Sequence, residues 1–207
     1  MKTYDPDRWT RRDHYRWYRS LEFPYLGITA NVDVTELVRA RKERGESLFA
    51  GMLHRIMAAA NRVDSLRQRI RVEDGHDVVV EHETVHPGFT VSGAEGLFNF
   101  ATAEFTADRT RFAEAVGEAS RAKRNATTLT PFEGQRDDLI FCSCIPWIDF
   151  THVTHPVPLK RLDSIPRIAW GRIVQDAHGA HCAVNIQAHH ALVDGAHVGA
   201  LFDNLGA

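Results

Sequence analysis

Two adjacent histidines near the end of the chain, His189 and His190, have the residue type and spacing that best suit catalysis. They follow an alternating run in which Val184, Ile186 and Ala188 share one face of an expected strand. His190 continues that face and His189 points the other way, so the two should not chelate one metal ion. A histidine at a strand end can rest its ring against fixed backbone while one nitrogen stays exposed. Because histidine titrates near neutral pH, that arrangement suits a general base.

Asp194 and Gly195 follow the histidines, where the expected strand gives way to a helix. Gly195 permits a backbone turn that a Cβ would resist. Taken alone, a His-His pair more often ends a core strand as two hydrogen-bonded side chains than it catalyses a reaction. A zinc site would have to draw its ligands from scattered histidines, so no metal is expected.

A family resemblance changes this balance. The segment His189-His190-Ala191-Leu192-Val193-Asp194-Gly195 matches the H-H-x-x-x-D-G signature of the chloramphenicol acetyltransferase and condensation-domain superfamily. Three more segments resemble motifs of chloramphenicol acetyltransferases, in the family's order: Trp9-Thr10-Arg11-Arg12-Asp13-His14-Tyr15, Val85-His86-Pro87-Gly88-Phe89-Thr90-Val91 and Ser143-Cys144-Ile145-Pro146-Trp147-Ile148-Asp149-Phe150-Thr151. They extend over nearly the whole chain, which is therefore identified as a member of this family.

The resemblance implies a catalytic apparatus. His190 would take the proton from an acceptor hydroxyl as that hydroxyl attacks the thioester of acetyl-CoA directly. Ser143 matches the serine that donates to the tetrahedral oxyanion. Asp194 would be structural and pair with Arg11, and a buried carboxylate at this turn suits a bidentate guanidinium. Ala169 departs from the pattern, because it stands where many members have a threonine that holds a water near the oxyanion.

The resemblance also implies binding residues for the two substrates. Arg172 falls where a lysine can meet the phosphates of CoA, although a solvated arginine at a strand end is about as expected. Trp147 could pack beside the pantetheine, with core packing as the safer expectation. Tyr18, Phe98 and Phe100 fall in segments that line the acceptor pocket, where core packing is again the more common role of an aromatic side chain.

The acceptor implied is chloramphenicol or a similar small alcohol, and antibiotic resistance is the role the family suggests. A homotrimer is expected, with each active site between subunits. One alternative is a biosynthetic acyltransferase that uses another acyl-CoA or a carrier-protein thioester. Another is a degenerate ligand-binding module, against which the joint presence of Arg11, Ser143, His190 and Asp194 argues.

The whole chain sets broad limits on function. Its 207 residues suit one domain, 1–207, and 43% hydrophobic with 25% charged residues is ordinary for a globular protein. A formal net charge of -2 gives no general attraction to nucleic acid. No apolar run approaches the ~20 residues of a membrane helix, and the charged, aromatic start lacks the apolar stretch of a signal peptide, so a cytoplasmic location is expected. The three cysteines, Cys142, Cys144 and Cys182, are expected to be structural thiols.

The hydrophobic pattern predicts a mixed sheet with several helices, an α/β (α+β) two-layer sandwich. Helices are expected over 10–20, from Thr35, as a cap, to about Arg44, and over 48–62, 108–123 and 194–205. Strands are expected over 28–34, 69–72, 77–81, 88–92, 97–105, 138–145, 165–175 and 181–189. Glu73-Asp74-Gly75-His76 indicates a hairpin, and Gly45 a helix end.

Overall fold

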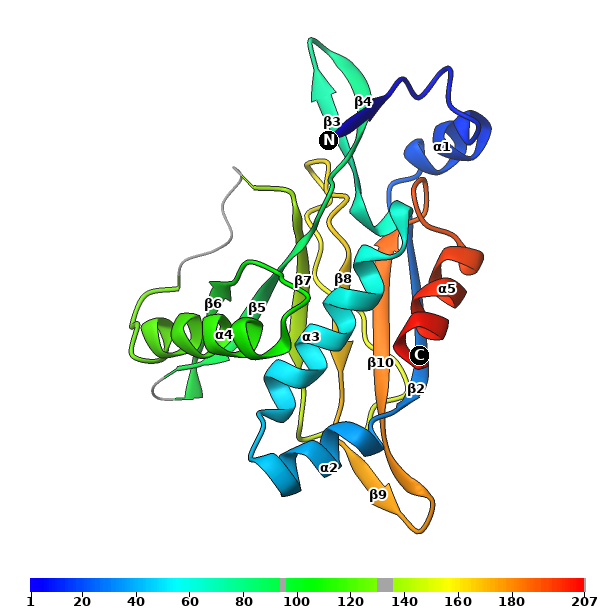
Figure 1. Ribbon diagram of the computed structural model, residues 1–207. Coiled ribbons are helices and arrows are strands. Elements are labelled where there is room, and N and C mark those ends of the chain that lie inside the picture. Colours follow the sequence, from blue (N-terminus) through cyan, green and yellow to red (C-terminus); the bar gives the residue numbers. More distant parts are fainter. Residues whose placement is uncertain (94–95, 130–135, 207) are drawn as a thin grey trace.

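The computed structural model describes residues 1–93, 96–129 and 136–206. Strands and helices alternate irregularly along the chain (Figure 1). The helices are α1 (Arg12–Arg19), α2 (Thr35–Arg44), α3 (Leu48–Asn61), α4 (Arg109–Arg124) and α5 (Gly195–Gly206), with a 3-10 turn, η1 (Asp64–Arg67). The strands are β1 (Lys2–Tyr4), β2 (Tyr25–Asp33), β3 (Gln68–Glu73), β4 (His76–Glu81), β5 (His86–Ser92), β6 (Phe98–Thr102), β7 (Leu139–Cys144), β8 (Arg167–Trp170), β9 (Val174–Asp176) and β10 (Gly179–His189).

The strands form two sheets. A three-stranded sheet has the order β1-β4-β3, and a seven-stranded sheet has the order β2-β10-β8-β7-β5-β6, with β9 paired to β10. The β5–β7 and β7–β8 pairs are parallel and the other pairs are antiparallel. The mixed sheet confirms the expected α+β class.

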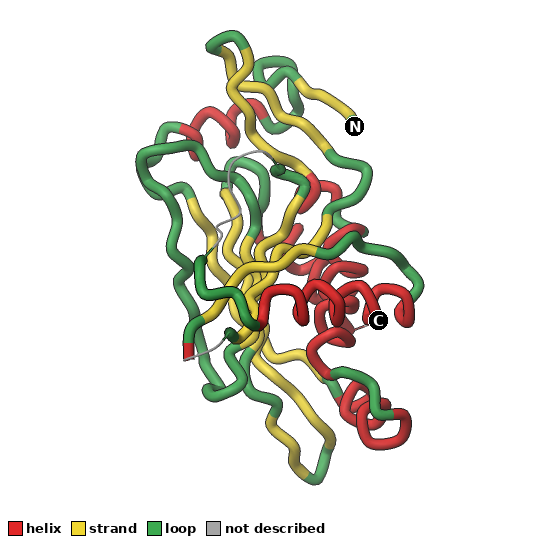
Figure 2. Tube along the Cα trace, turned by 90° about the vertical axis from the view of Figure 1, so that its left-hand side faces the viewer, coloured by secondary structure: helices red, strands yellow, loops and turns green. Residues whose placement is uncertain are grey.

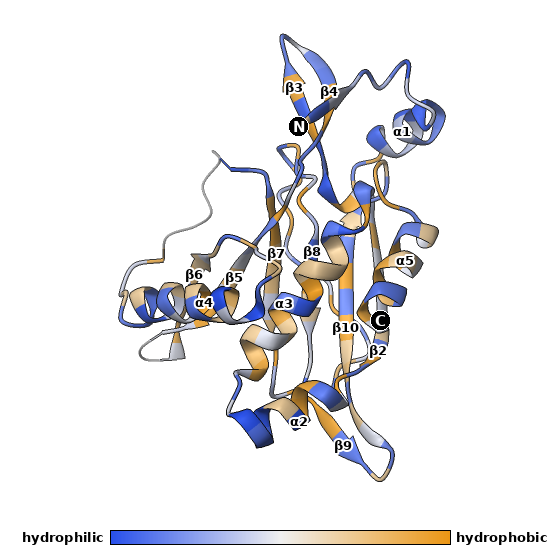
Figure 3. Cartoon of the chain, viewed as in Figure 1, coloured by the Kyte–Doolittle hydropathy of each residue, from blue (hydrophilic) through white to orange (hydrophobic). Residues whose placement is uncertain are grey.

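The core lies between the seven-stranded sheet and one layer of helices. Helix α3 packs against α4 and α5, and α5 also contacts β2. These three helices lie on one side of the sheet, and coil segments run along the other (Figure 2). Leu53, Ile56 and Met57 of α3 and Val184 and Ile186 of β10 are fully buried between them. Apolar residues accordingly follow α3 and β10, whereas α1 is mostly hydrophilic (Figure 3).

Two turns form as their residues require. Asp74 and Gly75 both have positive φ, 49° and 79°, which is the geometry of a tight two-residue hairpin between β3 and β4. Gly45 ends α2 in the left-handed region, with φ 69°. Thr35 is not the cap that was expected: it is the first residue of α2, and its hydroxyl accepts a hydrogen bond from the Ala180 amide at 2.9 Å.

The strand expected over 165–175 is interrupted, which corrects that prediction. Between β8 and β9 the Gly171 amide donates to the Ala183 carbonyl, and the Arg172 amide donates to the Ile148 carbonyl, both at 2.9 Å. A Cβ on Gly171 would lie 2.9 Å from that Ile148 oxygen, so only glycine allows the loop to approach so closely. Among the described residues, no helix is long and apolar enough to cross a membrane.

Candidate active site

His190 lies directly after β10, where its ring is held by contacts from the N-terminal segment. The Tyr18 ring of α1 stacks on it, with ring centroids 3.9 Å apart and an interplanar angle of 14°. The His190 amide donates to the Pro24 carbonyl at 2.7 Å, which fixes the backbone. Its Nδ1 is buried and has no hydrogen-bond partner among the described residues. The imidazole is therefore oriented by packing, and Nε2 is the nitrogen left to meet a substrate.

His189 has a different environment, as strand alternation predicts. Its side chain is 3% exposed, and its Nδ1 accepts a hydrogen bond from the Ala191 amide at 3.2 Å. The Tyr25 ring packs against it edge-on at 5.6 Å. Burial, helped by the nearby Arg19 guanidinium, lowers the pKa of His189 to about 4. His189 is thus a neutral packing residue, closed off from solvent.

Asp194 joins the histidine turn to two other elements. Its Oδ2 lies 2.7 Å from NH1 of Arg11, and its Oδ1 accepts from the Ala196 amide at 3.1 Å, which caps α5. The Nδ1 of His197 lies 2.9 Å from the same Oδ1. Burial alone would raise the pKa of Asp194, but the Arg11 hydrogen bond and the His197 contacts hold it below its ordinary value.

The Arg11–Asp194 pair departs from the expected buried, bidentate geometry. The side chains are 21% and 32% exposed, and one guanidinium nitrogen makes the contact. Nε and NH2 of Arg11 are buried without a partner among the described residues. The pair should therefore stabilise the fold less than a fully enclosed, doubly hydrogen-bonded pair.

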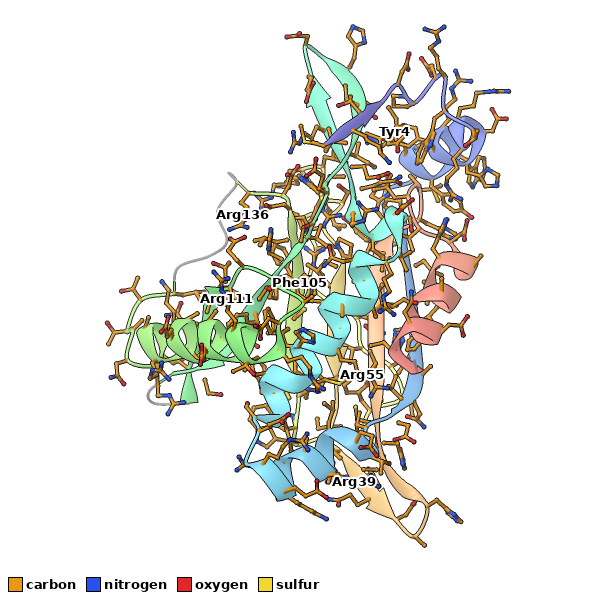
Figure 4. The ribbon with its side chains drawn as sticks, viewed as in Figure 1. Tyr4, Arg39, Arg55, Phe105, Arg111 and Arg136 are labelled. Atoms are coloured by element: carbon orange, nitrogen blue, oxygen red, sulfur yellow. The ribbon has the colours of Figure 1, made fainter. Side chains whose placement is uncertain are left out.

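Ser143 lies near the C-terminal end of β7, on the side of the sheet away from α3–α5. It lines a groove of about 1090 Å³ together with Phe98 and Phe100, two of the three expected acceptor residues. Their rings meet edge-on, with centroids 5.5 Å apart. Arg136, labelled in Figure 4, marks the opposite end of β7. Tyr18, the third expected acceptor residue, is not in this groove but beside His190.

The register of the sheet keeps Ser143 and His190 apart. Ser143 pairs with Ala169 on β8, and Ala169 pairs with Asn185 on β10. His190 is five residues beyond Asn185. Two strand spacings and five residues along a strand separate the two side chains by on the order of 19 Å. One chain therefore does not bring the expected base and the expected oxyanion donor together.

The groove also contains polar groups that the sequence analysis missed. His155, in the segment between β7 and β8, lies in the groove, and its Nε2 is 3.1 Å from Oδ1 of Asn185. Gln187 accepts from the His155 amide at 3.0 Å and donates to its carbonyl at 3.4 Å. Asn185 and Gln187 are buried polar residues on a core strand. In the sequence, Asn185 and Gln187 alternate with the apolar residues of an expected core strand, and this pattern could have predicted a buried polar network on the second face of the sheet.

The two residues expected to bind CoA are both on the surface. Arg172 is exposed in the break between β8 and β9. Trp147 is 73% exposed in the turn after β7, so core packing, the safer expectation, is wrong. Pro146 and Ile148, its neighbours, are exposed as well, which makes this turn an apolar surface. A role of either residue in CoA binding stays a prediction.

One pair of histidines, His82 and His86, has the H-x-x-x-H spacing found in some metal sites. His82 follows β4 and His86 begins β5, so the pair is not on a helix face. His82 instead contacts Asp137 at 3.0 Å, and Nδ1 of His86 accepts from the Phe105 amide at 2.9 Å. No group of three or more His, Cys, Asp or Glu that could hold a metal ion occurs in the part of the chain that the structure describes.

The three cysteines are free thiols. Cys142 is fully buried, and burial raises its pKa far above the ordinary value. Burial also raises the pKa of Cys144 to about 11 and that of Cys182 to about 12. Thiols that hold their protons so firmly are poor nucleophiles, in agreement with the structural role expected of them.

Comparisons with known proteins agree on one family. A sequence model of the family described as chloramphenicol acetyltransferase matches residues 1–206. Chloramphenicol acetyltransferase 3 of Escherichia coli is 24% identical over 203 residues, which cover 98% of this chain and 93% of that relative. A solved structure named chloramphenicol acetyltransferase superposes with a TM-score of 0.83 at 20% identity, covering 98% of this chain and 96% of the other. A probable dihydrolipoamide acetyltransferase of Listeria monocytogenes gives a TM-score of 0.65 at 15% identity over 93% of this chain and 88% of its own, a likeness of fold.

Proposed function

The chain belongs to the chloramphenicol acetyltransferase family and is an acyltransferase, and we propose that it transfers acetyl from acetyl-CoA to a hydroxyl of chloramphenicol or a similar small alcohol. His190 acts as the general base in this proposal and Ser143 as the oxyanion donor. The family uses acetyl-CoA as its co-substrate, which supports acetyl-CoA as the donor in this proposal.

The position of His190 is the observation that carries the proposal. The stacked Tyr18 ring and the hydrogen bond from the His190 amide to Pro24 already fix the imidazole. Little rotational entropy of the side chain is therefore lost when substrate binds. His189 cannot take this role, because it is enclosed and its Nδ1 already accepts from the Ala191 amide. Only His190 of the two presents a free ring nitrogen at the strand end.

The proposed step is direct transfer. The acceptor oxygen forms a bond to the thioester carbonyl carbon while Nε2 of His190 takes the hydroxyl proton. The hydroxyl of Ser143 donates to the carbonyl oxygen as its negative charge develops. The tetrahedral intermediate then breaks its carbon–sulfur bond, and the imidazolium returns the proton to the leaving thiolate. No acyl-enzyme forms, and the acetyl ester and CoA are the products.

The separation of Ser143 from His190 supports a site shared between subunits. Both residues can reach one carbonyl only if His190 of one chain faces Ser143 of another. The groove beside β7 is on the sheet face without helices, and Phe98, which lines it, is 54% exposed. We therefore propose a homotrimer, in which every pair of neighbours forms one complete site.

Thiol release tests the proposed function. The purified protein is incubated with acetyl-CoA and a panel of alcohols that includes chloramphenicol, and free CoA is measured. Acceptor-dependent release, with the acetyl ester identified by mass spectrometry, is expected. Release only with other acyl-CoA donors, or with an acylated carrier protein, would replace the donor in this proposal. No release with any donor would contradict catalysis itself.

Sedimentation tests the assembly independently. A single species of about three times the 23.4 kDa chain mass is expected. A stable monomer with full activity would refute the shared site, because one chain holds His190 and Ser143 too far apart.

A further inference from the structure

The polar network around His155 assigns the proton of its ring. The side-chain amide nitrogen of Asn185 donates to the Ile28 carbonyl at 3.4 Å and to the Thr29 hydroxyl at 3.0 Å. A carbonyl can only accept, so the Asn185 nitrogen must point to Ile28 and its Oδ1 must point to His155. Nε2 of His155, 3.1 Å from that Oδ1, therefore carries the proton.

This tautomer leaves Nδ1 of His155 as a hydrogen-bond acceptor. In a neutral imidazole one nitrogen donates and the other accepts. Nδ1 makes no hydrogen bond within the described residues, and it is not among the enclosed atoms that lack one. Two hydrogen bonds to Gln187 fix the His155 backbone, and the hydrogen bond to Asn185 fixes the ring. The groove therefore contains a fixed acceptor lone pair that the protein itself does not use.

Geometry places this lone pair at a useful distance from Ser143. Ser143, Ala169 and Asn185 are paired across three neighbouring strands, so their side chains share one face. Asn185 lies two strand spacings, about 10 Å, from Ser143. Ser143 and His155, the residue that Asn185 holds, both line the one groove. A small molecule that reacts beside Ser143 can thus extend along the groove and reach the His155 ring.

We propose that His155 determines acceptor specificity, by accepting a hydrogen bond at Nδ1 from a second O–H or N–H of the alcohol, one that does not react. This inference rests on the proposed function, since it takes the groove beside Ser143 as the acceptor site. Burial, opposed by the Asn185 hydrogen bond, lowers the pKa of His155, which keeps the accepting, neutral form at neutral pH. The acceptor is accordingly a small alcohol with at least two hydrogen-bond donors.

Matched acceptors test the proposal. Chloramphenicol carries a second hydroxyl and an amide N–H, and the probes are chloramphenicol, its 1-deoxy analogue and its N-methyl amide. Affinity is measured by calorimetry and kcat/KM by thiol release. With one of the two analogues, the affinity and kcat/KM of the wild-type protein should be about five- to tenfold lower than with chloramphenicol, the value of one net hydrogen bond. In His155→Leu the affinity and kcat/KM for the same analogue should be less than twofold lower than for chloramphenicol, because the partner nitrogen is gone.

Three variants separate this role from a structural one. His155→Leu leaves Oδ1 of Asn185 unpaired and could disturb the groove. His155→Gln can donate to Asn185 and offer its own carbonyl oxygen, so it should restore most of the contrast between acceptors. His152→Leu, an exposed histidine of the same segment, should keep the wild-type contrast. A His155→Leu protein that folds and keeps the full contrast would overturn the proposal.

The tautomer is tested without catalysis. Nitrogen NMR of the imidazole should show a protonated Nε2 and an unprotonated Nδ1 in the free protein, and Nδ1 should shift when chloramphenicol is added. If the wild-type protein turns over chloramphenicol and both analogues equally well, the role of His155 is refuted and the proposed function stands. Absent turnover refutes the proposed function, and the binding contrast and NMR shift still decide on His155. A wild-type protein that binds no probe overturns the inference, which commits to this class of alcohol.

Discussion

The end of β10 and the groove beside β7 each hold one residue proposed to act on the same carbonyl, yet they are built differently. At the end of β10, His190 is fixed by Tyr18 and Pro24 of one N-terminal segment. In the groove, Ser143 is surrounded by residues from β3, β5, β6 and the segment between β7 and β8. The difference teaches that His190 is held by contacts within one chain, whereas Ser143 lines an open groove that the proposed trimer would complete with a second subunit.

The largest expected effect is the loss of the base. His190→Ala should lower kcat/KM about 10²–10⁴-fold, because general base catalysis contributes that much. Thiol release measures the effect, with folding checked by circular dichroism. His189→Ala is the adjacent control and should lose stability more than turnover. If a folded His190→Ala enzyme kept most of its activity while a folded His189→Ala enzyme were inactive, the general base would be His189 and the assignment to His190 would be wrong.

The next effect concerns the other region. Ser143→Ala should lower kcat about 10²–10³-fold with little change in KM for acetyl-CoA, since an oxyanion donor acts mainly in the transition state. Ala169, which cannot hold a water by a side-chain hydroxyl, should make this serine more important. Cys144→Ala, the next residue on β7 and on the opposite face, is the control and should keep kcat within about twofold. Near-normal kcat in Ser143→Ala would remove the serine from the mechanism.

Mixing the two defective proteins tests whether the regions meet between subunits. Inactive His190→Ala and inactive Ser143→Ala chains, unfolded together and refolded at equal amounts, should regain about a quarter of wild-type activity, since random assembly joins the two intact residues at one site in four. Each variant refolded alone provides the baseline. A mixture no more active than that baseline, when wild-type chains refolded in the same way regain activity, would refute a site shared between subunits.

A smaller effect distinguishes the histidines through pH. The folded-state pKa of His189 is about 4, below the ordinary value near 6.5. The unfolded chain then binds more protons between these values, so stability is fully present above pH 6.5 and falls by roughly 1 to 3 kcal/mol toward pH 4. Urea unfolding at several pH values measures this slope, and His189→Gln should flatten it. An equal slope in both proteins would show that other groups cause it.

The smallest effect is expected from the ion pair at the histidine turn. Asp194→Ala and Arg11→Ala should each lower stability by about 1–2 kcal/mol, below the 3–5 of an enclosed pair, because the contact is single and partly exposed. Asp194→Ala should be the worse, since it also removes the cap of α5. Asp7→Ala, which breaks the exposed Arg16–Asp7 contact, is the control and should change little. An inactive Asp194→Ala with unchanged melting temperature would make Asp194 catalytic.

Local sequence patterns were sufficient for most elements. Alternation placed Val184, Ile186 and Ala188 in the core, and Asp74-Gly75 and Gly45 marked ends that need positive φ. Such signals lie within a few residues of the element they specify. The prediction of a continuous strand over 165–175 was wrong because the loop at Gly171 packs closely against the carbonyl of Ile148. That carbonyl is distant in the sequence, so no local pattern reveals the contact.

The sequence by itself determined the family, the α+β class and the candidate base, because these depend on contiguous motifs and on the periodicity of apolar residues. Only the tertiary structure decided how far Ser143 lies from His190, that Trp147 is exposed and that Asn185 holds His155 in the groove. Those facts depend on strand register and on a loop without periodicity, which bring together residues 16 to 30 positions apart. Side-chain pairing across such separations is set by the packed sheet as a whole, not by any short stretch of residues.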